Sequence, residues 1–243
     1  MPNPTAAMLV IGDEILSGRT RDSNMHHLAG RLTEHGIDLV EARVVADRAE
    51  AITEAARALS VAYDHVFTSG GIGPTHDDIT ADCIAAAGDA AIDVREDARA
   101  ILQAHYDARG SELNEARLRM ARIPDGAVLI ENPVSAAPGF TLGNIHVMAG
   151  VPKIFEAMLA GLLPRLKGGA PMQSRQIRVD RGEGDIAGPL SEVARAHPEI
   201  SVGSYPFTTE DGFGVNVVIR GSDPAALDAA MEKLRGHFPE GRE

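Results

Sequence analysis

The sequence contains no tryptophan, a single cysteine (Cys83) and only 4% aromatic residues. One cysteine excludes an intramolecular disulfide framework and any zinc or iron–sulfur site built from several cysteines. The scarcity of aromatic residues argues against the stacking platforms that bind single-stranded nucleic acids. Because Cys83 falls on the apolar face of an expected helix, we interpret it as a buried structural thiol.

Basic residues and long apolar runs are also scarce. The chain has 23 Lys plus Arg against 35 Asp plus Glu, a net charge of −12, which disfavours nucleic-acid binding. The longest apolar stretches, such as Ala7–Ile11, are far shorter than the roughly 18 residues that span a bilayer, and residues 1–8 lack the basic segment of a secretion signal. We therefore expect a cytoplasmic protein that binds neither nucleic acid nor a membrane.

The 243 residues, 44% of them apolar, alternate strand-like and helix-like patterns over the first two thirds of the chain. This alternation predicts an α/β fold in which helices cover a mostly parallel sheet. Helices are expected to begin at Asp22, Asp47 and Asp78, another is expected over residues 112–121, and residues 132–143 are expected to be turns. A stretch rich in Gly and Pro then separates two predicted domains, residues 1–167 and a small βαββα domain over residues 174–243.

The most informative segment is residues 69–80, which reads Ser-Gly-Gly-Ile-Gly-Pro-Thr-His-Asp-Asp-Ile-Thr. Consecutive glycines between a strand and a helix let main-chain N–H groups approach a phosphate. Asp78 and Asp82, four residues apart on a helix, would share a face suited to a hard cation that bridges to the phosphate. The alternative is a tight turn followed by a helix-capping box from Thr75 to Asp78.

A second candidate segment, Gly12-Asp13-Glu14, follows the first predicted strand. Loops at the carboxyl ends of parallel strands line one crevice, so this segment and the glycine loop can face the same space. The alternatives are an exposed acidic turn and, for Asp47 at another strand end, a helix-capping box with Glu50. Residues 132–140 and 149–152 contain further turns that could complete the pocket walls.

Taken together, these motifs resemble the molybdopterin-binding-domain superfamily, and within it the amino-terminal domain of the CinA (competence/damage-inducible) family. The resemblance extends over residues 8–158, in the family's motif order, and the tail resembles the small domain that follows. The sequence departs from the family pattern at Ser135, Ala149 and Ile154.

The resemblance implies a three-layer α/β/α domain that binds a phosphorylated pterin or nucleotide together with Mg²⁺ or another divalent cation. We also expect the protein to form a homo-oligomer. It also implies hydrolysis of nucleotide pyrophosphates such as ADP-ribose, whereas relatives in molybdenum-cofactor synthesis adenylylate molybdopterin. By position, Gly70, Gly71 and Gly73 match the phosphate-binding glycines, Asp78 matches the acidic residue of that loop, and Asp47 matches the strand-end acid.

Our leading hypothesis is a metal-dependent nucleotide pyrophosphatase, in which bound metal activates water without a cysteine or serine nucleophile. Asp78 and Asp47 are the predicted catalytic residues, and with Asp13 they are the predicted metal ligands. The predicted ligand-binding residues are Gly12, Asp13, Glu14, Ser69, Gly70, Gly71, Gly73, Pro74, Thr75, Pro138 and Gly139. The alternatives are a non-catalytic binder of the same ligands and a molybdopterin adenylyltransferase.

Overall fold

A computed structural model describes residues 3–209 and 212–242 of the chain. The chain divides into two compact units, Met1–Gly169 and Ala170–Glu243. Each unit has its own apolar core. Throughout the described residues, no helix has the length and apolar character needed to cross a membrane.

The first unit is built on a six-stranded sheet with the order β2-β1-β3-β8-β7-β6. The first four strands in that order run parallel, and the last two are antiparallel to their neighbours. Their bounds are β2 Asp38–Val45, β1 Thr5–Ile11, β3 His65–Ser69, β8 Ile145–Met148, β7 Gly139–Leu142 and β6 Val128–Ile130. The central strands β1 and β8 are almost wholly buried, as expected where both faces of a sheet are covered.

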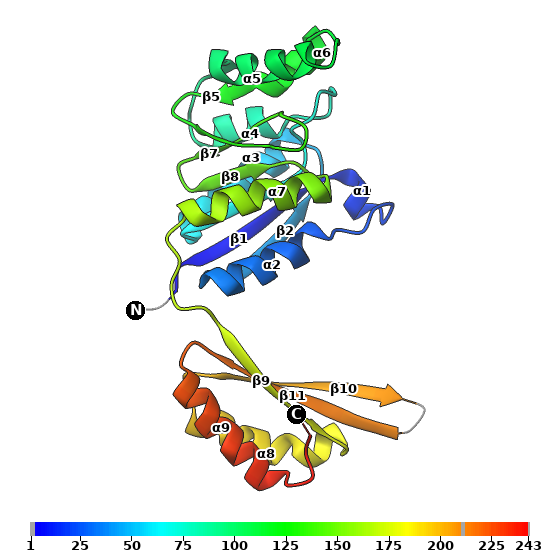
Figure 1. The fold of residues 1–243 in the computed structure, drawn as a ribbon, viewed down its shortest axis with the longest axis vertical. Helices are drawn as coiled ribbons and strands as arrows, with labels where there is room; N and C mark the ends of the chain where they lie inside the picture. The colour runs from blue at the N-terminus through cyan, green and yellow to red at the C-terminus, as the bar shows by residue number, and fades with distance from the viewer. Residues whose placement is uncertain (1–2, 210–211, 243) are drawn as a thin grey trace. The chain divides into compact units, whose positions relative to one another are not determined.

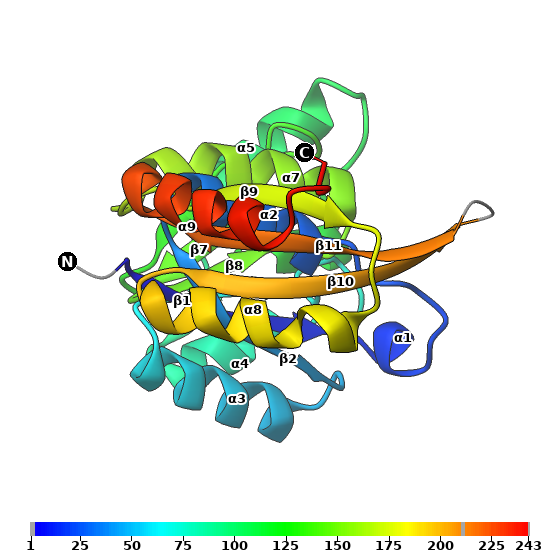
Figure 2. The same cartoon turned by 90° about the horizontal axis from the view of Figure 1, so that it is seen from below.

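Helices cover both faces of this sheet (Figure 1), which confirms the predicted three-layer α/β/α fold. One face is covered by α2 (Asn24–His35) and α7 (Pro152–Leu162), and the other by α3 (Ala49–Ala62), α4 (Thr80–Ala87) and α5 (Glu96–Asp107). The turned view in Figure 2 shows the sheet between α7 and the pair α3 and α4. Helix α2 ends at Gly36 in the left-handed conformation, where the sequence predicted its end.

Several local predictions for the first unit are wrong. Residues 112–121 form only the short helix α6 (Glu115–Leu118) and a 3₁₀ turn (Arg119–Ala121), which lead into β5 (Arg122–Pro124). Strand β5 pairs with β4 (Ile92–Val94). The segment expected to be turns contains β7, a four-residue strand held by pairing on both sides. Short strands of this kind depend on their neighbours more than on their own sequence.

The second unit has the predicted βαββα order. Its elements are β9 (Gln173–Val179), α8 (Glu183–Ala196), β10 (Ser201–Thr209), β11 (Gly212–Gly221) and α9 (Pro224–His237). The strands form an antiparallel sheet with the order β10-β11-β9. Both helices lie on one face of that sheet (Figures 1 and 2), where they bury Val193 and Leu234 against Val217 and Ile219.

Candidate functional site

A pocket of about 570 Å³ lies at the carboxyl ends of the parallel strands in the first unit. Six segments line it: the loops after β1 and β2, the glycine loop after β3, the 3₁₀ turn before β5, the loop between β6 and β7, and the turn between β8 and α7. The predicted convergence of these loops is therefore present in the structure. The volume lies within the range of about 300–1,000 Å³ that is typical of small-molecule sites.

The glycine loop has a conformation that only glycine accommodates readily. Gly70 and Gly71 have φ of +108° and +68°. A Cβ atom at Gly70 would lie 2.3 Å from the carbonyl oxygen of Ile11, and one at Gly71 would lie 2.1 Å from Oγ1 of Thr80. The chain therefore passes close to β1 and to the start of α4, and side chains at either position would displace it.

The same loop offers unused hydrogen-bond donors. The N–H groups of Gly71, Ile72 and Gly73 have no acceptor among the residues that the structure describes, although all three residues line the pocket. The Gly70 N–H, in contrast, donates to the carbonyl of Met148 at 3.2 Å. Successive main-chain N–H groups without partners are what an anionic group requires.

Asp78 closes a turn and does not begin a helix, which corrects two predictions. Its Oδ2 accepts hydrogen bonds from the N–H of Thr75 at 2.8 Å and from the Thr75 hydroxyl at 2.5 Å. Helix α4 starts at Thr80, so Asp78 and Asp82 do not share a helix face. Asp82 is instead paired with Arg122 at 2.5 Å.

Asp47 is likewise not a helix cap. Helix α3 begins at Ala49, preceded by Arg48, and Oδ2 of Asp47 accepts a hydrogen bond from the Asp13 N–H at 2.8 Å. Burial raises the pKa of the Asp47 carboxyl above its usual 3.8, and the negative charges of Asp13, Glu14 and Asp77 act in the same direction. This carboxylate therefore has neighbours of the same charge, and a bound cation would relieve the repulsion between them.

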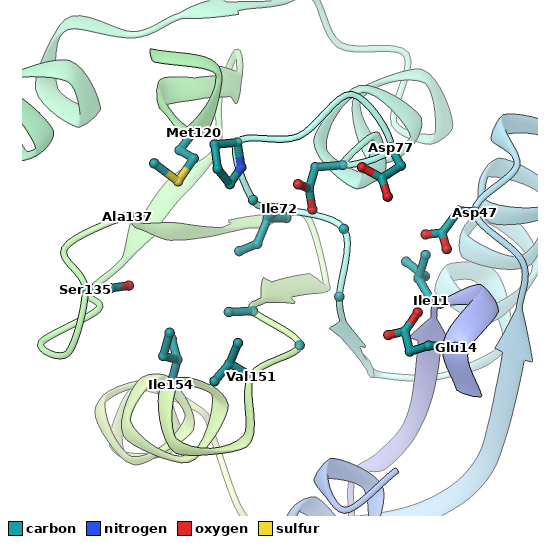
Figure 3. A pocket seen from close by; sticks show the side chains of 18 of the residues that line it. Ile11, Glu14, Asp47, Ile72, Asp77, Met120, Ser135, Ala137, Val151 and Ile154 are labelled. Atoms are coloured by element: carbon teal, nitrogen blue, oxygen red, sulfur yellow. The ribbon is translucent and has the colours of Figure 1, made fainter. Parts of the chain in front are cut away.

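The pocket has an acidic side and an apolar side, as Figure 3 shows. The acidic side comprises Glu14, Asp47 and Asp77, which lie together in Figure 3, and Asp78, which follows Asp77 in the chain and also lines the pocket. On the apolar side, the lining side chains are Ile72, Met120, Ala137, Val151 and Ile154, with the hydroxyl of Ser135 among them.

Two buried asparagines fix the loops around the pocket. Asn24, at the start of α2, donates through Nδ2 to Oγ of Ser69 at 2.7 Å and to the carbonyl of Gly150 at 2.8 Å. Asn132 holds the loop between β6 and β7 by four hydrogen bonds to residues 134, 135 and 137. The loops on both sides of the pocket are thus held by buried amide side chains.

The structure brings most, but not all, of the predicted catalytic, metal-binding and ligand-binding residues to the pocket. Those that line it are Gly12, Glu14, Asp47, Gly70, Gly71, Gly73, Pro74 and Asp78. Those that are not part of the lining are Asp13, Ser69, Thr75, Pro138 and Gly139. Asp13 contributes its N–H to Asp47, and Ser69 contributes its hydroxyl to Asn24.

The prediction did not select several lining residues: Ile11, Thr20, Ile72, Asp77 and Met120. Asp77 and Ile72 lie within the glycine-loop segment, and their place in that segment was the only available signal. Met120 comes from the 3₁₀ turn before β5. Nothing in its local sequence marks it as a pocket residue.

The predicted metal ligands are not gathered into one ligand set. Among the described residues, no three or more His, Cys, Asp or Glu side chains form a group that could hold a metal ion by themselves. Carboxylates nevertheless concentrate on the acidic side. This arrangement fits Mg²⁺, which commonly uses one or two carboxylates together with water and substrate phosphate oxygens.

Two other residues from the sequence analysis have clear environments. Cys83 is a buried free thiol in α4, as predicted, and burial raises its pKa. His76 has a side chain that is 99% exposed. It is therefore a solvated turn residue in this structure and not part of the pocket lining.

The fold and the pocket place the first unit in the class of α/β domains that take up a small ligand at the carboxyl ends of parallel strands. Residues 7–168 match the family model described as "Probable molybdopterin binding domain". The chain belongs to this family. Residues 171–242 match a second model, that of the FAD synthase middle domain.

Individual relatives agree with this assignment. A protein of Pyrobaculum calidifontis is 38% identical over 247 residues, which cover 95% of this chain and 94% of that protein. The solved structure of the CinA protein of Thermoplasma acidophilum is similar to 66% of this chain, with 36% identity and a TM-score of 0.61, and 98% of it is covered. A Caenorhabditis briggsae protein named "Probable FAD synthase" is 31% identical over 96% of this chain, which spans 50% of its length.

Proposed function

We propose that the pocket binds a nucleotide pyrophosphate and hydrolyses its phosphoanhydride bond with the help of a divalent cation. The observation that carries this proposal is the placement of unused N–H donors of the glycine loop beside the carboxylates of Glu14, Asp47 and Asp77. Donors alone would suit an anion, and carboxylates alone would repel it. Both together suit a phosphate that arrives with a cation.

In this proposal each part of the pocket has a defined task. The N–H groups of Gly71, Ile72 and Gly73 hold the oxygens of the diphosphate, aided by the amino end of α7 at Val151–Pro152. Asp47 and Asp78 hold the cation, with Glu14 and Asp77 close by. When bound, the cation would neutralise charge on the phosphoryl oxygens and lower the pKa of a bound water.

The substrate class follows from the relatives as well as from the pocket. The second unit matches the FAD synthase middle domain, and a relative bears the name "Probable FAD synthase". We therefore propose FAD as a substrate beside ADP-ribose, since both contain an adenosine diphosphate linked to a second group.

The direct test is incubation of the full chain with FAD or ADP-ribose and Mg²⁺ or Mn²⁺, followed by chromatography of the nucleotides. We expect AMP and FMN from FAD, and AMP and ribose 5-phosphate from ADP-ribose, with no products in EDTA. Folded protein that cleaves neither compound with either metal would overturn the proposal.

A second candidate is a binder without turnover. The absence of a three-carboxylate metal group among the described residues favours it, because hydrolysis then depends on ligands that the substrate must supply. Calorimetry that shows tight binding of intact FAD, together with chromatography that shows no products, would support this candidate. Transfer of labelled AMP from ATP to molybdopterin would instead indicate the adenylyltransferase.

A further inference from the structure

The loop between β6 and β7 fixes the direction of a hydrogen bond at the pocket. Oδ1 of Asn132 accepts hydrogen bonds from the N–H groups of Val134 at 3.1 Å and Ser135 at 3.0 Å. Main-chain N–H groups can only donate, so these two bonds identify the oxygen of the Asn132 amide. The other end of the amide is therefore the NH₂ group, which donates to Oγ of Ser135 at 2.7 Å and to the carbonyl of Ala137 at 2.8 Å.

This assignment determines what Ser135 offers to a ligand. Because its Oγ accepts from Asn132, the hydroxyl proton must be directed elsewhere. No acceptor for that proton is found in the described part of the chain, and Ser135 lines the pocket with its hydroxyl facing the cavity in Figure 3. Ser135 thus presents a hydrogen-bond donor to the pocket. Its hydroxyl is held in place by Asn132, whose side chain is buried, since this residue is 7% exposed.

The surroundings of this donor are apolar. Met120, Ala137 and Ile154 line the same side of the pocket, away from the carboxylates of Glu14 and Asp47 (Figure 3). An apolar surface with one oriented donor is complementary to a flat heteroaromatic ring that has an acceptor on its edge. Phosphate oxygens and ribose hydroxyl groups need polar partners, which this surface offers only at Ser135.

We propose that Ser135 is a specificity residue, whose hydroxyl donates a hydrogen bond to a ring nitrogen or ring carbonyl of the ligand's heteroaromatic group. This inference rests on the proposed function, because it assumes that the phosphates occupy the glycine loop. The ligand class is then a nucleotide with an acceptor-bearing ring, adenine or the isoalloxazine of a flavin. The hydrogen bond selects the ring and takes no part in cleavage of the anhydride.

The experiment uses ligands that cannot be hydrolysed at an anhydride. AMP, FMN and ribose 5-phosphate are titrated in the presence of Mg²⁺ into the wild-type chain, Ser135→Ala and Ser191→Ala, and binding is followed by calorimetry. Ribose 5-phosphate is AMP without its ring. Ser191 is an exposed serine of α8 whose hydroxyl donates to the carbonyl of Ala187, so its replacement controls for loss of a serine hydroxyl away from the pocket.

We expect Ser135→Ala to weaken the binding of AMP or FMN by about three- to tenfold, the usual effect of losing one neutral hydrogen bond. Binding of ribose 5-phosphate should stay unchanged, and Ser191→Ala should behave as wild type. The ligand that binds more weakly to Ser135→Ala carries the ring that Ser135 contacts. A structural role for Ser135 would instead weaken all three ligands alike.

The possible failures are distinguishable. Unchanged binding of both AMP and FMN by Ser135→Ala, or an equal loss for all three ligands, would overturn the Ser135 proposal alone. Wild-type protein that binds neither AMP nor FMN would overturn the Ser135 proposal, and if it also cleaves neither FAD nor ADP-ribose it would overturn the proposed function as well. Wild-type protein that binds them but does not cleave FAD or ADP-ribose would overturn only the proposed hydrolysis.

Discussion

The acidic and apolar sides of the pocket are fixed by different means. On the acidic side, carboxylates are held by N–H groups of nearby loops, as in the bonds from Asp13 to Asp47 and from Thr75 to Asp78. On the apolar side, one buried amide, that of Asn132, holds a whole loop. The acidic side therefore contains carboxylates that repel one another, whereas the apolar side has no such repulsion and its loop is held by hydrogen bonds to Asn132.

This difference indicates how the two sides should respond to change. A substitution on the acidic side should alter charge and turnover while the fold stays intact, because those carboxylates are partly solvated. A substitution on the apolar side should alter affinity for a ring and leave phosphate binding as it was. The glycine loop belongs to both sides, and a substitution there should affect the fold as well.

The largest expected effect comes from removing one charge on the acidic side. Asp78→Asn should lower the rate of FAD hydrolysis by about 1,000-fold, because an amide is a poor substitute for a carboxylate that holds a divalent cation. The amide oxygen can still accept a bond from the Thr75 N–H, so the loss of stability should be at most about 1 kcal/mol, a shift of roughly 2–4 °C in Tm. Steady-state rates and thermal melts measure the two quantities.

Asp64→Asn is the matched control for that variant. Oδ2 of Asp64 accepts hydrogen bonds from the N–H and the hydroxyl of Thr5, both at 2.8 Å, in the same way as Oδ2 of Asp78 accepts from Thr75. Asp64 does not line the pocket, so its variant should keep full activity. If Asp78→Asn also stays active, its carboxylate only closes the turn, and the acidic side has no catalytic role at this position.

The next largest effect concerns the glycine loop. Gly71→Ala should lower the free energy of unfolding by about 3 kcal/mol, because it combines a left-handed backbone with a Cβ atom 2.1 Å from Oγ1 of Thr80. Gly110 has a similar φ of +62° but open space around it, so Gly110→Ala should cost only about 1 kcal/mol. Urea denaturation of both variants measures the difference. Equal losses would show that the close packing of the loop against Thr80 contributes nothing.

The glycine loop is also the part of the site that the sequence predicted best. Gly70, Gly71 and Gly73 interrupt both regular structures, so a loop between a strand and a helix was readable from local chemistry alone. The start of the following helix was not readable. It is set by the turn between Thr75 and Asp78 and by the bond from the Thr80 N–H to the carbonyl of Gly71, which compete with helix propensity.

The apolar side was hardly predictable, for a different reason. Met120 reaches the pocket from a 3₁₀ turn that precedes β5. Its position depends on how the segment between α4 and β6 packs against the rest of the domain. The direction of the Ser135 hydroxyl, toward the cavity, depends on the hydrogen bonds from the N–H groups of Val134 and Ser135 to Asn132. A sequence pattern records the period of helices and strands, and neither feature has a period.

A third, smaller effect sharpens the contrast between the two sides. Ile154→Ala removes part of the apolar surface, and we expect the affinity for AMP to fall about fivefold, since roughly 1 kcal/mol is lost when about 40 Å² of apolar contact is removed. Affinity for ribose 5-phosphate should not change. Ile101 on α5 is 41% exposed and lies outside the pocket lining, so Ile101→Ala is the control. An equal loss for both ligands would show that Ile154 acts through the fold and not through the ring.

The smallest expected effect is a dependence of stability on pH that originates on the acidic side. Burial and neighbouring charges raise the pKa of Asp47 in the folded state, so the folded state holds this proton more tightly than the unfolded chain. The resulting stabilisation is present below the unfolded pKa of about 3.9 and is lost as pH rises through the folded-state pKa. Asp47→Asn removes this titration. Its Tm relative to wild type should therefore rise between pH 4 and pH 7.

The effect should remain below about 1 kcal/mol, because Asp47 is only half-buried and the remaining solvent contact screens the neighbouring charges. Asp64→Asn should show the opposite sign, since hydrogen bonds from Thr5 lower the pKa of Asp64 and its stabilisation is present above the unfolded pKa. Added Mg²⁺ should raise the Tm of wild type more than that of Asp47→Asn, because a bound cation relieves the repulsion that the amide has already removed. If Mg²⁺ raises both melting temperatures equally, Asp47 does not hold the cation, and its raised pKa reflects only burial beside other carboxylates.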